Sequence, residues 1–166
     1  GWSSCNGLVI DLSCLKENGV NQQAGIAHVE AGLTWGELDR ETARLGLAVP
    51  GGIISTTGIA GLTLGGGVGW LVRKYGLSCD NLVAAKLVTA DGHSKHVSSS
   101  ENADLFWAIR GGGGNFGIVT EFTYRLHPVA EVFGGRVVFD GDRGKSLLKH
   151  YRELPESISD DLTASI

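Results

Sequence analysis

The sequence predicts an α+β fold. Two observations support this class: predicted strands and helices mix without strict β-α alternation, and a hairpin pattern occupies residues 81–97. The 166 residues are enough to bury one core of ordinary size, or one core plus a fragment of another.

The first elements follow from hydrophobic periodicity and turn residues. Residues 7–12 and 25–31 are predicted strands, because apolar residues cluster there between polar turn residues. Thr34 is the predicted N-cap of a helix, Glu37 completes a capping box three residues later, and helical spacing of apolar residues continues up to Gly46. Residues 47–50 are predicted to be extended, and a glycine-rich segment follows up to residue 69.

The later elements alternate less regularly. A hairpin is predicted with strands at residues 81–89 and 94–97 around an Asp91-Gly92 turn. The remaining expected elements, in chain order, are a helix at 101–110, strands at 117–126 and 132–139, and a helix at 145–154. The segment 129–135, between a closing strand and a new β-α unit, is a candidate domain boundary.

Composition argues against several partners. The formal net charge is −4 and the basic residues are scattered, so no nucleic-acid partner is expected. The apolar stretches are too short to span a bilayer, so no membrane association is expected either. Three cysteines without a Cys-x-x-Cys pair favour a reduced, cytoplasmic protein. The start at Gly1 resembles no signal peptide, and we expect the reading frame to begin upstream.

Several short motifs resemble known binding or catalytic patterns, but the predicted elements or residues around them do not fit those patterns. Residues 112–117 fit G-x-G-x-x-G, but a predicted helix precedes them and a strand follows, the reverse of the Rossmann arrangement. His93 and His96 lack a matching third ligand, so they are expected to be exposed histidines, and no metal site is predicted. No Gly-x-Ser-x-Gly elbow is present, which gives hydrolase chemistry no support.

The 26 glycines are about twice the usual share of roughly 7 per cent. Many of them fall in two dense runs, at residues 58–69 and 111–117. Glycine loops let backbone N–H groups converge on an anion without an intervening side chain. The alternative is a pair of tightly packed turns, but two such runs favour a large anionic cofactor.

The ordered motifs resemble flavoproteins of the p-cresol methylhydroxylase and vanillyl-alcohol oxidase type, especially the berberine-bridge-enzyme-like branch and its bacterial oxidase relatives. The stretches that carry the resemblance are 29–32 (VEAG), 58–69 (GIAGLTLGGGVG), 73–77 (RKYGL) and 104–120 (DLFWAIRGGGGNFGIVT), the last being the most specific. The resemblance implies the second, carboxyl-side subdomain of an FAD-binding domain at residues 1–129. It also implies the start of a substrate-binding domain at residues 130–166.

The resemblance also implies which residues face FAD. The first run and the loop before it would line the diphosphate and ribityl region, and the second run would contact the adenine end through its backbone, with Asn115 holding the loop. The implied cofactor-binding residues are Gly52, Ile54, Thr57, Gly58, Gly61, Leu62, Gly65, Gly114, Asn115, Gly117, Ile118 and Val119. No catalytic residue is implied by the stretches present.

Departures from the family pattern qualify this expectation. Many relatives attach FAD to a histidine in an amino-side loop, which would precede Gly1, and some add a second link through a cysteine where this chain has Ile54. Two hypotheses therefore stand: part of an oxidoreductase that oxidises an alcohol, sugar or amine with oxygen as acceptor, or a truncated non-catalytic module that binds flavin weakly or not at all and acts by protein–protein association. In either case, apolar surface exposed by truncation predicts a homo-oligomer.

Overall fold

The computed structural model describes residues 6–129 and 131–166, and its centre is a five-stranded antiparallel sheet. The strands lie in the order β1-β2-β6-β4-β5, so the last long strand of the sequence inserts between two earlier ones. Their bounds are β1 Asn18–Asn21, β2 Ile26–Glu30, β4 Leu82–Val88, β5 Ser94–Ser98 and β6 Ile118–Arg125. This arrangement confirms the predicted α+β class and the β4–β5 hairpin.

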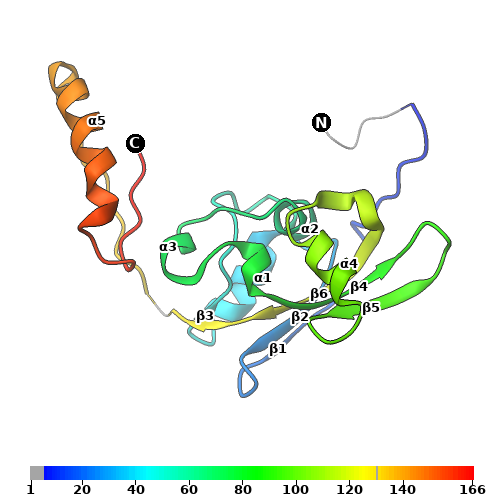
Figure 1. The fold of residues 1–166 in the computed structure, drawn as a ribbon. Helices are drawn as coiled ribbons and strands as arrows, with labels where there is room; N and C mark the ends of the chain where they lie inside the picture. The colour runs from blue at the N-terminus through cyan, green and yellow to red at the C-terminus, as the bar shows by residue number, and fades with distance from the viewer. Residues whose placement is uncertain (1–5, 130) are drawn as a thin grey trace.

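Short helices cover one face of this sheet (Figure 1). Their bounds are α1 Trp35–Ala43, α2 Ile59–Leu64, α3 Val72–Tyr75 and α4 Ala103–Ile109. The core between the two layers includes Trp35 and Leu38 of α1 and Phe122 and Tyr124 of β6, each exposing 1% or less of its surface. None of the helices formed by the described residues is long and apolar enough to cross a membrane.

The predicted N-terminus of α1 is confirmed. The carboxylate of Glu37 accepts hydrogen bonds from the backbone N–H and the hydroxyl of Thr34, at 2.8 and 2.9 Å, and from Lys16 Nζ at 2.6 Å. The Lys16 and Thr34 bonds lower the pKa of Glu37 to about 2. The carboxylate therefore stays charged at the helix end, where negative charge is favoured.

The chain leaves the sheet through a small second sheet. In it β3, Leu47–Ala48, pairs antiparallel with β7, His127–Pro128. Beyond residue 130 an extended segment leads to α5, Gly144–Glu153, which stands to one side of the main sheet (Figure 1). The segment after α5 returns to α3, where Arg73 donates to the carbonyl of Ile158 at 3.2 Å and pairs with Asp160 at 3.2 Å.

Two local expectations were wrong, and one segment without a predicted element contains a helix. Residues 7–12 form no strand, and Leu8, Val9 and Ile10 are each more than half exposed; β1, which begins six residues after this segment, pairs with β2 instead. Residues 132–139 also form no strand, because no neighbouring strand is in position to pair with them among the described residues. The glycine-rich segment contains a helix, α2, because Ile59, Thr63 and Leu64 are buried together on one side of it.

Candidate functional site

The two glycine runs, which residues 70–110 separate in the sequence, meet at the carboxyl end of α2. The backbone N–H of Gly111 donates to the carbonyl of Leu64 at 3.0 Å. Gly111 has φ +112°, a conformation that L side chains rarely adopt, so the backbone favours glycine here even though an added Cβ would meet no atom within 4 Å. The two runs therefore lie in one region of the molecule.

One side of α2 is made of glycine. Gly58, Gly61 and Gly65 are exposed and follow one another at helical spacing, while the opposite side of the helix is buried. A Cβ added at Gly61 would meet no atom within 4 Å, so internal packing does not explain the choice of glycine there. Because glycine in a helix interior costs about 1 kcal/mol relative to alanine, the exposed side of α2 suits close approach by a ligand.

Other glycines in the same region have an internal reason. A Cβ on Gly69 would lie 1.6 Å from the carbonyl oxygen of Gly51, and one on Gly52 would lie 2.8 Å from Leu62 Cδ1. The packed-turn alternative therefore accounts for Gly52 and Gly69, and it leaves Gly58 and Gly61 unexplained. Leu62 is half-buried and packs against the hydrophobic core from the side of the Gly52 loop.

The loop before α2 is fixed to the start of α1. The backbone N–H of Trp35 donates to Thr57 O at 2.9 Å, and the backbone N–H of Gly36 donates to Ser55 O at 2.8 Å. These bonds leave the side chains of Ile53 and Ile54 pointing outward, 55% and 60% exposed. An exposed apolar pair on an anchored loop offers a surface that suits the ring system of a cofactor or substrate.

The second run forms a short 3-10 turn and then enters β6. Within this turn, Asn115 Nδ2 donates to Gly112 O at 2.8 Å. Gly114 is exposed with no atom within 4 Å of an added Cβ, whereas Gly117 is tightly packed, with φ +148° and Val88 O at 2.6 Å from the added Cβ. The second run thus contains both open and packed positions, as the first run does.

Ile118 and Val119 can offer only their backbone to a ligand. The Val119 side chain is 3% exposed and lies in the core, and the Ile118 side chain is half-buried. Both residues pair with β4 on one side, while the register of β2 along β6 ends at Glu121. The other backbone edge of these two residues therefore lies beyond the end of β2.

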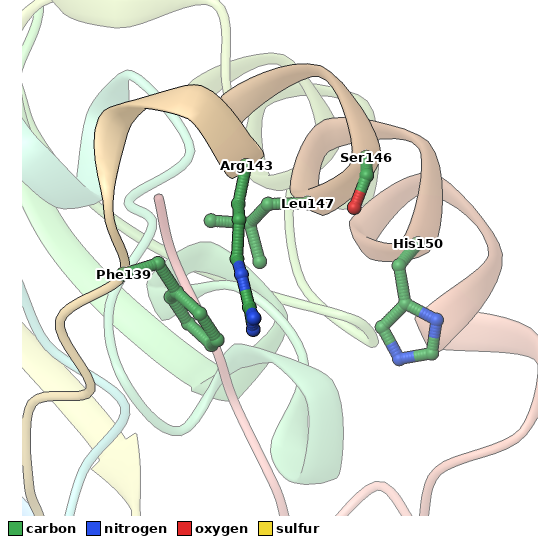
Figure 2. A pocket seen from close by; sticks show the side chains of 5 residues that line it. All are labelled: Phe139, Arg143, Ser146, Leu147 and His150. Atoms are coloured by element: carbon green, nitrogen blue, oxygen red, sulfur yellow. The ribbon is translucent and has the colours of Figure 1, made fainter.

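Two hollows lie near α5. One, of about 370 Å³, is an open hollow between the loop at Ile53, the residues around Trp70 and the segment after α5. The other, of about 310 Å³, lies on α5 itself and is lined by Phe139, Arg143, Ser146, Leu147 and His150 (Figure 2). None of the predicted cofactor-binding residues lines either hollow, although Ile53 adjoins Ile54.

Sequence reasoning missed the polar groups that join these elements. Arg110 Nε donates to Cys79 O at 3.1 Å, and Asn81 Nδ2 donates to the carbonyls of Tyr75 and Leu77 at 2.9 and 2.8 Å. The only available signal was position: Arg110 directly precedes the second glycine run, and Asn81 is the first residue of the predicted strand at 81–89. His93 and His96, expected to be exposed, have side chains 75% and 49% exposed.

Comparison with known proteins identifies the class. A family model described as an FAD binding domain matches residues 1–98, more than half of the chain, and the chain belongs to this family. An FAD-linked oxidoreductase of Dictyostelium discoideum is 42% identical over 164 residues, which cover 95% of this chain and 36% of that protein. The chain thus spans about a third of the length of this relative.

Solved structures agree on the fold. The crystal structure of 6-hydroxy-D-nicotine oxidase from Arthrobacter nicotinovorans matches with a TM-score of 0.75 and 40% identity, covering 77% of this chain and 28% of that one. A berberine-bridge-enzyme-like protein of Physcomitrella patens matches with a TM-score of 0.65 and 40% identity, covering 69% of this chain and 25% of that one. The predicted resemblance to the berberine-bridge-enzyme-like branch, and FAD as the cofactor, are therefore confirmed.

The exposed glycine side of α2 fits such a cofactor. FAD carries a diphosphate, which accepts hydrogen bonds from backbone N–H groups where no side chain intervenes. When bound, the flavin supplies hydride and electron transfer, and the protein supplies binding and orientation. Gly58, Gly61 and Gly65 provide the open backbone surface that this requires.

Proposed function

We propose that this chain is the FAD-binding portion of a flavin-dependent oxidoreductase whose whole protein oxidises an alcohol, a sugar or an amine and passes the electrons to oxygen. The observation that carries the proposal is the exposed glycine side of α2 beside the second glycine run. Family membership supports it, because the matched relatives carry FAD-linked oxidoreductase names. A truncated module without flavin is the weaker alternative, because it leaves the open glycines without a reason.

In this proposal FAD lies in an extended form across both glycine runs. The first run and the preceding loop take the diphosphate and ribityl chain, and the second run takes the adenine end. The residues assigned to the cofactor are Gly52, Ile54, Thr57, Gly58, Gly61, Leu62, Gly65, Gly114, Asn115, Gly117, Ile118 and Val119. Ile54 has no thiol, so a second covalent link at this position is not expected.

The domain division belongs to the same proposal. Residues 1–129 form the cofactor-binding part, and residues 130–166 begin a substrate-binding domain. The main sheet and its helices end before residue 130, and α5 stands apart from them (Figure 1). A cytoplasmic location and the absence of nucleic-acid and membrane partners stay predictions from composition.

Self-association is also proposed, through exposed apolar residues. Val132, Phe133, Val137 and Val138 are each at least 75% exposed, in a segment whose sequence favours a strand. Sedimentation velocity over a wide concentration range should show dimers or larger species. A monomer at every concentration would contradict this part of the proposal.

The test of the main proposal is the visible spectrum of the purified chain after incubation with FAD and gel filtration. Flavin absorbance that co-elutes with the protein supports the proposal. A thermally unfolded sample provides the control for non-specific carry-over. Colourless protein, with a far-UV circular dichroism spectrum of a folded chain, would overturn FAD binding by this chain.

A further inference from the structure

We propose that Arg110 is a positioning residue that fixes the second glycine run against the first and so preorganises the FAD site. The inference rests on the proposed function. Arg110 lies at the end of α4, immediately before Gly111, and its side chain is 34% exposed. Its proposed role follows from a closed ring of hydrogen bonds that joins three segments distant in the sequence.

The ring passes through three segments. Gly111 N–H donates to Leu64 O at 3.0 Å, which ties the second run to α2. Cys79 N–H donates to Gly66 O at 2.9 Å, which ties the turn Ser78–Asn81 to the end of the first run. Arg110 Nε then donates to Cys79 O at 3.1 Å and closes the circuit back to Gly111.

Arg110 is the only side chain in this ring. The other two bonds join backbone groups, whose pairing is set by the path of the chain, whereas the Arg110 bond depends on one guanidinium. That guanidinium is itself oriented: Nη2 lies 3.6 Å from Asp80 Oδ1, and its carbon lies 5.4 Å from the centre of the Phe106 ring. Asp80 is fixed in turn, because its second oxygen accepts the Leu77 N–H at 2.9 Å.

The second run needs such an anchor because glycine restricts the backbone least. Residues 111–114 are four consecutive glycines, and ordering each of them costs more conformational entropy than ordering any other residue. A glycine run that is already ordered before the ligand arrives binds the ligand more tightly, because binding then causes no further loss of conformational entropy in the run. Arg110 supplies this order at the residue from which the run starts.

The test compares Arg110→Met and Arg110→Lys with the wild-type chain. Methionine keeps an apolar stem beside Phe106 and removes every donor, whereas lysine keeps the charge opposite Asp80 but lacks the planar fork that reaches Cys79 O and Asp80 together. Arg44→Met is the matched control, because Arg44 is an exposed arginine whose guanidinium pairs with Glu41 within α1. FAD dissociation constants are measured by flavin fluorescence at a temperature where circular dichroism shows each variant folded.

We expect Arg110→Met to raise the FAD dissociation constant about tenfold or more, and Arg44→Met to change it less than about twofold. Arg110→Lys should have an unfolding midpoint close to that of the wild-type chain, but its FAD affinity should stay as low as that of Arg110→Met. A merely structural role would instead let affinity return together with stability. In the flavin-free chain, the Gly111 amide should exchange with deuterium faster in both Arg110 variants than in wild type.

The outcomes separate this inference from the proposed function. If wild type binds FAD and the folded Arg110 variants bind it equally well, the positioning role is wrong and the proposed function stands. If Arg110→Met does not fold, Arg110→Lys decides: wild-type affinity, or unchanged exchange at Gly111, overturns the inference. If wild type itself binds no FAD, both proposals fail together.

Discussion

The hydroxyl groups of Thr63 and Tyr124 lie 2.6 Å apart, and neither residue exposes any of its surface. Thr63 belongs to α2 and Tyr124 to β6, so this hydrogen bond joins the helix of the first glycine run to the central strand of the sheet. Burial raises the pKa of Tyr124 above its ordinary value, which keeps the phenol protonated and able to donate. The bond fixes the distance between α2 and the sheet. It therefore also fixes the position of the exposed glycine side of α2.

Removing one partner of this bond should be costly. Tyr124→Phe leaves the Thr63 hydroxyl buried and unpaired, and we expect a loss of about 1–3 kcal/mol in the free energy of unfolding. Thr63→Val, which leaves the phenol unpaired, should fall in the same range. Urea unfolding of both single variants and of the double variant measures the coupling. If the two losses simply add, the hydroxyls do not interact in solution.

Gly61→Ala should separate stability from cofactor binding. An added methyl meets no atom of the chain, so the free energy of unfolding of the flavin-free protein should rise by up to about 1 kcal/mol. FAD affinity should nevertheless fall, because the methyl stands on the exposed side of α2. Gly19→Ala in β1, where an added methyl also meets nothing within 4 Å, is the matched control. If the FAD affinity of Gly61→Ala is unchanged, the cofactor does not bind against the exposed side of α2.

Gly117→Ala should have the opposite effect on stability. Its φ of +148° and the approach of Val88 O to 2.6 Å leave no room for a methyl without a shift of β4 or β6. We expect a loss of about 2 kcal/mol or more in the free energy of unfolding. Thermal and urea denaturation measure it, with Gly114→Ala as the control at an open position of the same run. Equal stability of the two variants would contradict the distinction between packed and open glycines.

His127 should make stability depend on pH. Its Nε2 lies 2.6 Å from Asn81 Oδ1, and because the Asn81 amide N–H groups donate to backbone carbonyls, the histidine N–H is the donor. Burial, helped by the positive charge of Arg125, lowers the pKa of His127 below 6.5. The unfolded chain therefore binds the proton more readily, and the fold should lose stability as the pH falls below 6.5 until the folded pKa is passed.

The measurement for His127 is the urea unfolding free energy at a series of pH values around 6.5. His127→Gln, which can still donate to Asn81, should flatten this dependence. His93→Gln, at the exposed tip of the β4–β5 hairpin, is the control and should leave it in place. An identical pH profile in wild type and His127→Gln would show that the histidine does not contribute.

The segment after α5 should detach when its acidic residues are neutralised. Arg73 pairs with Asp160 at 3.2 Å, and Lys74 pairs with Asp161 beside it. Both aspartates are largely exposed, so the contact should weaken with salt and should contribute to docking more than to global stability. In Asp160→Asn/Asp161→Asn, limited proteolysis after residue 153 should be faster than in wild type at low salt. High salt should abolish the difference; a difference that persists would point to another cause.

Local sequence patterns determined much of this protein. The capping box at Thr34 and Glu37, the Asp91-Gly92 turn and the helix predicted at 101–110 each depend on residues a few positions apart, and all three appear where the sequence predicts them. The ordered motifs also determined the family and the cofactor, because a long set of residues in fixed order carries that information without coordinates.

Only the tertiary structure decided which glycines are packed and which are open, and how the two runs meet. Gly61 and Gly69 are indistinguishable in the sequence, yet one faces open space and the other the carbonyl of Gly51. The pairing of β1 in place of residues 7–12, the Thr63–Tyr124 bond and the ring closed by Arg110 all join residues distant in the chain. Such contacts depend on how whole elements pack, and a pattern of neighbouring residues does not contain that information.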